Sequence, residues 1–561
     1  MDRRRSGRRG CLLALTVSGA ALILAACGSS STSAPTSTST SASVALAKPS
    51  GTPSASLVVN QSQAPGTIDP AFSEAAPEVG PEWAVYATLT AFVHVPGKVP
   101  GTSEGNLDVN TVKPYIAQSW KFSENDTTLT FQIRPGLKFP SGDPLNAEAV
   151  AWSLKRTIRA EGGAYSVIEE NQFKPALIQS VTATGPLTVV IKYSRPAPNQ
   201  LQIFAGPDAG SIYDPALVEA HGGQKPTKPN TWLATHDAGY GPYLLKSYEP
   251  NHQMVLEANP NFFEPPKTKR IVLNFIPSNE TLLLDAQSGA ADVTLGLSGE
   301  GAHSLEGQSC CVVTPFKSAN AEMLNLPENK ANKEFESQLF REALSYAIPY
   351  EGILKKVAYG YGKLYFGEWM PTFAAYDPTI GAAREYNPEK AKKLLAQSGI
   401  KTPITIPIYI AVGDNNGKEI ATAVQGAWQP LGVNVQVKVI SPADFSEVVY
   451  TTHTGPTIFY EGPAAVAPEY YWAYDLQCPK ENPYNANLAC VPAADKLMKE
   501  VFKTTNEATR QRLFDEADRL YVKDTPRIWV YNSEPVTVAA KDVTSVYLSD
   551  GLPDMRFWAK N

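Results

Sequence analysis

The chain has 561 residues, more than one hydrophobic core ordinarily serves, so its length predicts two or more domains. Its 43% hydrophobic and 10% aromatic content is that of an ordinary globular protein. The net charge is −6; the first 26 residues contribute +4, so residues 27–561 carry about −10, and this mildly acidic balance argues against a nucleic-acid partner.

The N-terminus has the pattern of a targeting segment. Five arginines precede an apolar run from Cys11 to Ala26, which has signal-peptide length and is short for a membrane span. The run ends in Leu24-Ala25-Ala26-Cys27, which is similar to a lipobox, and in lipoproteins of that kind the cysteine is diacylated and becomes the first residue. We expect residues 1–26 to be a lipoprotein signal peptide and Cys27 to be lipidated. Export by the general or the twin-arginine route stays open.

The next stretch, residues 27–56, is rich in Ser, Thr, Ala and Pro and lacks apolar periodicity. It predicts a disordered tether, in which the roughly 28 residues from Ser29 to Ser56 would span about 30 Å root-mean-square. No other stretch resembles a transmembrane helix, so the expected anchor is a lipid on the outer face of the cell membrane.

Residues 114–156 predict a strand, two turns and a helix. Apolar side chains at 129, 131 and 133 alternate with polar ones, which is typical of a half-buried strand. Turn chemistry follows in Pro135-Gly136 and in residues 141–144. Asn146 can cap a helix whose apolar side carries Val150, Leu154 and Ile158. Periodicity alone makes this an ordinary strand–turn–helix.

The same segment resembles the signature of the bacterial family 5 extracellular solute-binding proteins, the dipeptide, oligopeptide and nickel class. The matching positions are Pro114, Ala117, Ser119, Trp120, Phe131, Arg134, Gly136, Lys138, Phe139, Gly142, Pro144, Ala147, Val150, Ser153 and Arg156. Further matches lie at 239–243, 256–263, 283–293, 341–348 and 387–399, so the resemblance covers most of residues 57–561. The chain departs from the pattern at Tyr240, where Thr is usual, and at Pro349-Tyr350, where the proline predicts an early helix end.

The resemblance implies an α/β fold of the two-lobed periplasmic-binding-protein kind, type II and similar to cluster C. We expect an N-terminal lobe at 57–311 with an extra subdomain at about 91–212, a C-terminal lobe at 312–525, and a return to the first lobe at 526–561. Ligand would lie between the lobes and be enclosed by a hinge motion. The implied partners are a solute and the permease subunits of an ABC importer, and we expect a monomer without cofactor or metal.

Periodicity and end signals predict the other elements in chain order. The expected strands lie at 57–59, 187–193, 433–439 and 527–531, the last returning to the first lobe. The expected helices lie at 339–348, 387–399, 420–431 and 513–521, and the resemblance implies a further helix at 82–92.

Four cysteines remain when Cys11 leaves with the signal and Cys27 carries lipid: Cys310, Cys311, Cys478 and Cys490. An exported chain permits disulfides. Pairing Cys478 with Cys490 closes a loop of about a dozen residues, worth about 3 kcal/mol, and is the pair we favour. A strained vicinal bond at Cys310-Cys311, reduced thiols and cross-pairing stay open, since four cysteines allow three connectivities. A metal site is the weaker alternative, because no CxxC is present.

No catalytic motif stands out. The sequence has no G-x-S-x-G, H-E-x-x-H or G-x-x-x-x-G-K-[ST], and its six histidines show no ligand spacing. We therefore expect a binding protein and not an enzyme. A hydrolase with a glycosidase-type carboxylate pair stays open, because nothing singles out one pair of acids.

Aromatic residues crowd residues 458–475, and such side chains suit a cleft that packs on ligand. In peptide-binding relatives this region commonly holds an aspartate that pairs with the α-ammonium of the ligand. Ala467 stands there and cannot pair with an amine, so Glu461 or Glu469 is the candidate substitute. The expected ligand-binding residues are Asp69, Phe72, Tyr240, Trp369, Tyr460, Glu461, Glu469, Tyr471 and Trp472, with Glu368 as a further cleft residue. Core packing is the alternative for each aromatic.

The predicted function is capture of a peptide or peptide-like solute for an ABC importer. A glycoside, an opine-like compound or a metal chelate are alternative ligands. A lipid-anchored hydrolase and a receptor that signals without transport are alternative functions.

Overall fold

The computed structural model describes residues 56–73, 76–94, 105–123, 125–170, 175–316, 318, 320–371, 373, 375–380, 384–461, 468–480, 482, 485–504, 506–549 and 552–560. The predicted signal peptide, lipidated Cys27 and nearly all of the tether lie outside these residues, as does Ala467. The side chains of Tyr460 and Glu461 also lie outside the description.

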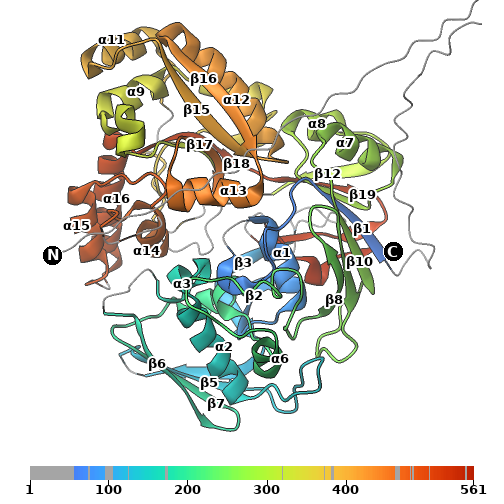
Figure 1. Ribbon diagram of the computed structural model, residues 1–561. Coiled ribbons are helices and arrows are strands. Elements are labelled where there is room, and N and C mark those ends of the chain that lie inside the picture. Colours follow the sequence, from blue (N-terminus) through green and yellow to red (C-terminus); the bar gives the residue numbers. More distant parts are fainter. Residues whose placement is uncertain are drawn as a thin grey trace, which may run out of the picture. The chain divides into compact units, whose positions relative to one another are not determined.

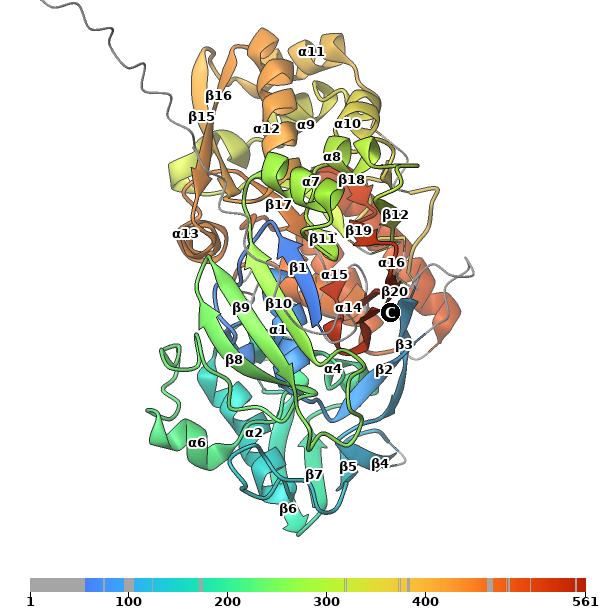
Figure 2. The ribbon, with the colours of Figure 1, turned by 90° about the vertical axis from the view of Figure 1, so that its right-hand side faces the viewer.

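A seven-stranded mixed sheet organises the first lobe, in the order β12-β19-β11-β1-β10-β9-β8. Its strands are β1 (Ser56–Gln61), β8 (Tyr243–Glu249), β9 (Gln253–Ala258), β10 (Arg270–Phe275), β11 (Val293–Leu295), β12 (Cys311–Pro315) and β19 (Val536–Ala540). β1 pairs in parallel with both β10 and β11. Its Leu-Val-Val run is buried, as expected for a central strand covered on both faces. Figure 2 shows β8, β9, β10 and β1 side by side.

A six-stranded sheet organises the second lobe, in the order β14-β18-β13-β17-β15-β16. Its strands are β13 (Ala321–Asn325), β14 (Gly362–Lys363), β15 (Ile404–Ala411), β16 (Val433–Ile440), β17 (Thr457–Glu461) and β18 (Arg527–Ser533). β15 and β16 are parallel and are connected through α12 (Asn415–Trp428), which packs on them (Figure 1). The other helices of this lobe are α9 (Gln338–Tyr346), α10 (Tyr350–Lys356), α11 (Pro388–Ser398), α13 (Pro442–Glu447), α14 (Pro468–Tyr471), α15 (Pro492–Val501) and α16 (Glu507–Asp524).

A separate four-stranded antiparallel sheet, β4-β5-β7-β6, contains the predicted strand–turn–helix. Its strands are β4 (Ala117–Phe122), β5 (Thr128–Ile133), β6 (Ile178–Gly185) and β7 (Thr188–Tyr193). β5 alternates buried and half-buried side chains, and Asn146 Oδ1 accepts a hydrogen bond of 3.0 Å from Ala149 N at the start of α2 (Ala147–Ala160). Both predictions are confirmed. α2 lies against β6 and β7 (Figure 1).

Shorter elements connect these sheets. The helices are α1 (Ala76–Val85), α3 (Gly163–Ile168), α4 (Gln200–Ile203), α5 (Pro207–Gly210), α6 (Pro215–Ala220), α7 (Asn279–Ser288) and α8 (Gly299–Ser304). Strands β2 (Thr90–His94), β3 (Gly105–Pro114), β21 (Tyr547–Ser549) and β22 (Leu552–Pro553) form one small sheet, and β20 (Val543–Ser545) pairs with β23 (Ala559–Lys560).

Two predicted elements differ from the structure. The helix expected at 82–92 is divided into α1, which ends at Val85, and strand β2, because β2 pairs with the distant β3. The strand at Arg527 does not return to the first lobe, since β18 pairs with β13 of the six-stranded sheet. The return is made one strand later, by β19.

The chain passes from the first sheet to the second between β12 and β13 and comes back between β18 and β19. The segment that leads back, Ser533 to Val536, is short. Such crossing segments are where two lobes can rotate against each other.

Candidate functional site

A cavity of about 190 Å³ lies where the chain crosses between the two sheets. It is lined by residues at the carboxyl ends of β1 and β11 in the first lobe, by residues 413–416 after β15 in the second lobe, and by the returning segment 533–537. In open α/β sheets ligands bind outside the carboxyl ends of the strands. Contacts from both lobes make this cavity the candidate ligand site among the described residues.

Two glycines allow close approaches at this point: Gly413 of the second lobe lies against Ser62 of the first, and Gly296 lies against Ser62 within the first lobe. A Cβ on Gly413, whose φ is +86°, would lie 2.3 Å from Ser62 O, and one on Gly296, whose φ is +75°, would lie 2.0 Å from Ser62 Oγ. Side-chain amides then connect the lobes. Asn415 Nδ2 donates to Gly296 O at 3.0 Å, and Gly299 N donates to Asn416 Oδ1 at 3.2 Å.

The cavity is acidic. Glu322 on β13 is 1% exposed, and burial raises its pKa well above the ordinary value, with a further rise from repulsion by Asp414 and a lowering by a hydrogen bond to Asn416. Burial also raises the pKa of Asp414 to about 6, although the Gly417 amide donates to Asp414 Oδ1 at 2.8 Å. Glu534 is the third acid that lines the cavity.

The residues predicted in the first lobe contact protein groups. Asp69 is fully buried, and its two carboxylate oxygens accept hydrogen bonds of 2.9 and 2.7 Å from Arg156. Tyr240 is 1% exposed and donates to Asn261 O at 3.2 Å. Phe72 is half-buried at the end of a 3-10 helix, Pro70–Phe72.

Three predicted aromatics lie in the core of the second lobe. Trp369 Nε1 donates to Phe514 O at 2.9 Å, and Trp472 Nε1 donates to Tyr521 Oη at 2.9 Å. Tyr471 is 1% exposed, and its ring meets that of Phe373 edge-on with centroids 5.5 Å apart. Their positions match the core-packing alternative.

Glu469, the predicted amine partner, is 7% exposed and forms an ion pair with Arg510. Glu368 is buried as well and lies 3.4 Å from Arg527 Nε. Both carboxylates therefore already face a guanidinium of the protein.

The predicted aromatic segment does reach the other lobe through Tyr470. Its side chain packs in the hydrophobic cluster of the first-lobe subdomain, and its ring stacks on Tyr474 at 6.1 Å. Nearby, the guanidinium of Arg195 lies 5.0 Å above the ring of Phe502 from the second lobe. This contact between lobes is therefore made by neighbours of the residues that were predicted to bind ligand.

Glu322 and Asp414 were missed from the sequence, although each carried a signal. Glu322 is an acid among the apolar residues Ala321, Met323 and Leu324. Asp414 lies in the short loop after strand β15 and caps α12, the position at which α/β folds place ligand groups.

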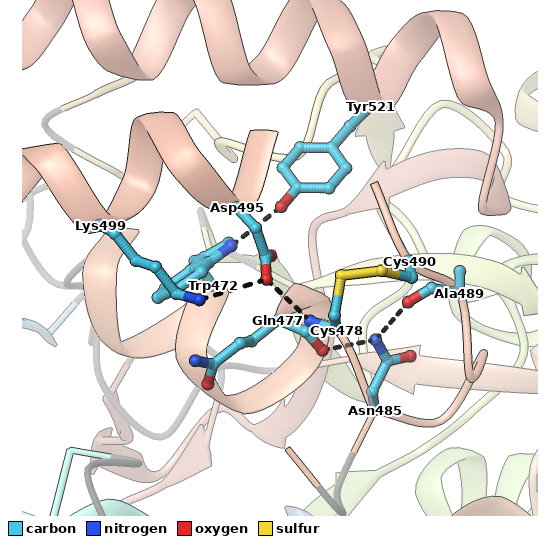
Figure 3. Close-up of a disulfide and its surroundings, with 9 residues drawn as sticks. All are labelled: Trp472, Gln477, Cys478, Asn485, Ala489, Cys490, Asp495, Lys499 and Tyr521. Carbon is cyan, nitrogen blue, oxygen red and sulfur yellow. Dashed lines mark hydrogen bonds and ion pairs between the residues drawn. A yellow bond between two sulfur atoms is a disulfide. The ribbon is translucent and has the colours of Figure 1, made fainter. Parts of the chain in front are cut away.

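Cys478 and Cys490 form a disulfide, the pair favoured from the sequence (Figure 3). The loop between them is held by Asn485, whose Nδ2 donates to Gln477 O at 2.9 Å and to Ala489 O at 3.0 Å. Asp495 Oδ2 accepts a hydrogen bond of 3.3 Å from Cys478 N. Cys310 and Cys311 are free.

Two further properties concern the residues that the structure describes. No group of three or more His, Cys, Asp or Glu side chains is arranged there to hold a metal ion. None of the helices in this part of the chain has the length and apolar character needed to cross a membrane.

Two α/β lobes, joined by crossing segments and with a cavity between them, define a two-lobed solute-binding protein. The chain belongs to the bacterial extracellular solute-binding proteins, family 5, whose middle-region model matches residues 111–511. This is a family of binding proteins and not of enzymes.

Known relatives cover nearly the whole body. The chain is 24% identical over 497 residues to the probable D,D-dipeptide-binding periplasmic protein DdpA of Escherichia coli K12, over 88% of this chain and 92% of DdpA. The fold is similar to that of DppA from Helicobacter pylori in complex with peptide STSA, with TM-score 0.76, 20% identity, and 90% and 98% of the two chains covered. NikA from Staphylococcus aureus with Ni(L-His)2 gives TM-score 0.74, 19% identity, and 90% and 100% coverage.

Proposed function

We propose that this protein captures a peptide or peptide-like solute between its lobes and delivers it to the permease subunits of an ABC importer. The observation that carries the proposal is the cavity lined from both lobes and from the returning crossing segment. DdpA and DppA, with their peptide ligands, support the ligand class.

The proposal includes the cellular context. The arginine-rich apolar N-terminus supports a signal peptide over residues 1–26, and the lipobox-like sequence supports lipid attachment at Cys27. A monomer anchored in this way on the outer face of the membrane would hold captured solute near its transporter. Mass spectrometry of the protein released from membranes tests the anchor, because a diacylated Cys27 shifts the N-terminal mass.

The domain limits form part of the proposal. The seven-stranded sheet supports a first lobe beginning near residue 57, and strand β12, which ends at Pro315, extends that lobe slightly beyond the expected limit at 311. The second lobe then comprises β13 to β18, and the return begins between Ser533 and Val536.

Native mass spectrometry of the full chain, purified without refolding, tests the ligand class. A retained series of peptide masses is the expected result. A single non-peptide mass contradicts the peptide assignment while keeping the binding function. Release of cleaved products on incubation with the retained ligand contradicts the binding function and favours the hydrolase alternative.

A further inference from the structure

We propose that the solute carries a positively charged nitrogen, bound by Glu322 and Asp414 in the cavity between the lobes. The inference rests on the proposed capture function and specifies its ligand. Two sources supply such a group in peptides: the N-terminal α-ammonium, and the ammonium or guanidinium of a Lys or Arg side chain.

Buried acceptors without partners surround the cavity. Glu322 Oε2 and Gln61 Oε1 have no hydrogen-bond partner among the described residues, and both side chains are at least nine-tenths buried. The amide of Gln61 is fixed in orientation, because its Nε2 donates to Gln63 O at 2.8 Å. Native proteins rarely leave buried acceptors unsatisfied, so these groups indicate a missing donor.

Two hydroxyls on the returning segment extend this set. Ser533 Oγ and Thr537 Oγ1 are buried, line the cavity and likewise have no partner among the described residues. An ammonium presents three N–H donors and a guanidinium presents five, so either can satisfy several of these acceptors together.

The charge of the lining has one sign. Among the described residues that line the cavity, three carry a carboxyl group and none is Lys, Arg or His. The lack of a positive side chain in this lining distinguishes Glu322 and Asp414 from three other buried acids. Asp69, Glu368 and Glu469 each face an arginine. A cation from outside the protein would complete a charge-assisted pair at the two acids.

The oxygen atoms that line the cavity suit an organic cation better than a metal ion. Calcium takes six to eight oxygen ligands and magnesium a near-ideal octahedron, whereas the described residues include no group of three or more His, Cys, Asp or Glu side chains arranged to hold a metal ion. The cavity volume of about 190 Å³ is far larger than the roughly 10–15 Å³ that one water molecule needs. The cavity therefore has room for a side chain or a peptide terminus with its charged end.

The experiment compares the wild-type protein with the double variant Glu322→Gln, Asp414→Asn. Both substitutions conserve size, and Asn replaces Asp well as a helix cap. Glu500→Gln, an exposed acid on α15, is the matched control. Wild type and variants are offered random tripeptides in three pools: free N-termini, N-acetylated with Lys or Arg, and N-acetylated without Lys or Arg. Bound peptides are identified by native mass spectrometry.

The expected result is that wild type and Glu500→Gln bind one or both cationic pools at least about 10-fold better than the third pool. The double variant should lose that preference while remaining folded. Selection of the free N-termini assigns the site to the α-ammonium, and selection of acetylated Lys or Arg peptides assigns it to a side chain. Equal binding of all three pools overturns the inference but leaves peptide capture intact.

A second arm separates failure of the inference from failure of the peptide assignment. Thermal unfolding is measured with putrescine, with agmatine, with the neutral 1,4-butanediol, and with Mg²⁺ or Ca²⁺. If no peptide binds, a rise in Tm with the amines alone, absent in the double variant, still supports a cation site. No rise in Tm and no peptide binding overturns it, and a rise with Mg²⁺ or Ca²⁺ alone overturns the organic cation.

Discussion

Asp69, a residue predicted to bind ligand, forms an ion pair with Arg156. Both side chains have 0% exposure, so this is the most completely buried ion pair that the structure describes for a predicted ligand-binding residue. The guanidinium contacts both carboxylate oxygens and also lies 4.5 Å from the centre of the Tyr213 ring. Asp69 caps the 3-10 helix at Pro70–Phe72 as well. This residue was expected to bind ligand, but its surroundings favour a structural role.

We predict that Asp69→Asn lowers the free energy of unfolding by about 3–5 kcal/mol, because it leaves the Arg156 charge buried without a partner. Urea unfolding followed by circular dichroism measures the change. The matched control is Glu516→Gln, which breaks the exposed Arg512–Glu516 pair and should cost about 0.3–0.5 kcal/mol. A stable Asp69→Asn protein with weakened ligand affinity would restore Asp69 to the ligand site.

Asp414 makes stability depend on pH. Its folded-state pKa is raised to about 6, so between about pH 4 and 6 the folded chain binds more protons than the unfolded chain. The contribution of this group to the free energy of unfolding therefore falls as pH rises through that window. Glu322 adds to the effect in the same direction, and Asn416, Gly417 and the first-lobe residues around the cavity supply no compensating positive side chain.

We predict that Asp414→Asn gains stability relative to the wild type as pH rises from 4 to 7 in ligand-free protein. Parallel urea-unfolding series at several pH values measure the difference. Parallel stability curves for the two proteins would show that Asp414 titrates normally and is not desolvated in the folded state.

At the scale of elements, local signals predicted helices and strands well. Asn387, Pro388 and Gly399 mark both ends of α11, and the structure has Asn387 Oδ1 accepting from Lys390 N at 3.0 Å and Gly399 at φ +74°. Pro349 was expected to end a helix early, and α9 ends at Tyr346. These helix ends are determined by residues that lie within about one helical turn of them in the sequence.

The failures depend on distant residues. The segment at 90–94 became a strand because residues 107–114 lie beside it, which no local pattern encodes. The aromatics at 471 and 472 carry the composition of a cleft, but the packing of Phe373 and Tyr521 decides that they face the core. Glu322 lies on β13 and Asp414 lies in the loop after β15, and only the order of the six-stranded sheet brings them to one cavity.

The disulfide closes the loop that follows α14 and the π-helix Trp472–Leu476 (Figure 3). We predict that the double variant Cys478→Ser, Cys490→Ser loses about 3 kcal/mol of stability, because a closed loop of this size removes entropy from the unfolded chain. Urea unfolding measures the loss. Cys310→Ser, at a free and half-buried cysteine, is the control and should change little. Equal stability of the two variants would mean that the disulfide contributes nothing to the folded state.

At the scale of the molecule, the two lobes meet in at least two places. On one side, the loops after β11 and β15 are joined by the amides of Asn415 and Asn416. On the other, Tyr470 packs into the cluster of the first-lobe subdomain and Phe502 lies under Arg195. Opening of the lobes would require both sets of contacts to separate.

Gly413 gives a direct test of whether this closure is needed for binding. We predict that Gly413→Ala weakens ligand binding at least about 10-fold, because the added Cβ would meet the Ser62 carbonyl of the other lobe at 2.3 Å. Alanine at a positive φ also costs about 1–2 kcal/mol of stability through strain alone.

Gly399→Ala controls for that strain, since Gly399 has φ +74° and no atom within 4 Å of an added Cβ. Tripeptide binding by calorimetry and the radius of gyration by X-ray scattering, with and without ligand, measure the outcome. Both variants should lose similar stability, but only Gly413→Ala should fail to contract when peptide is added. If the two variants bind and contract alike, the approach of the β15–α12 loop to β1 is not part of ligand capture.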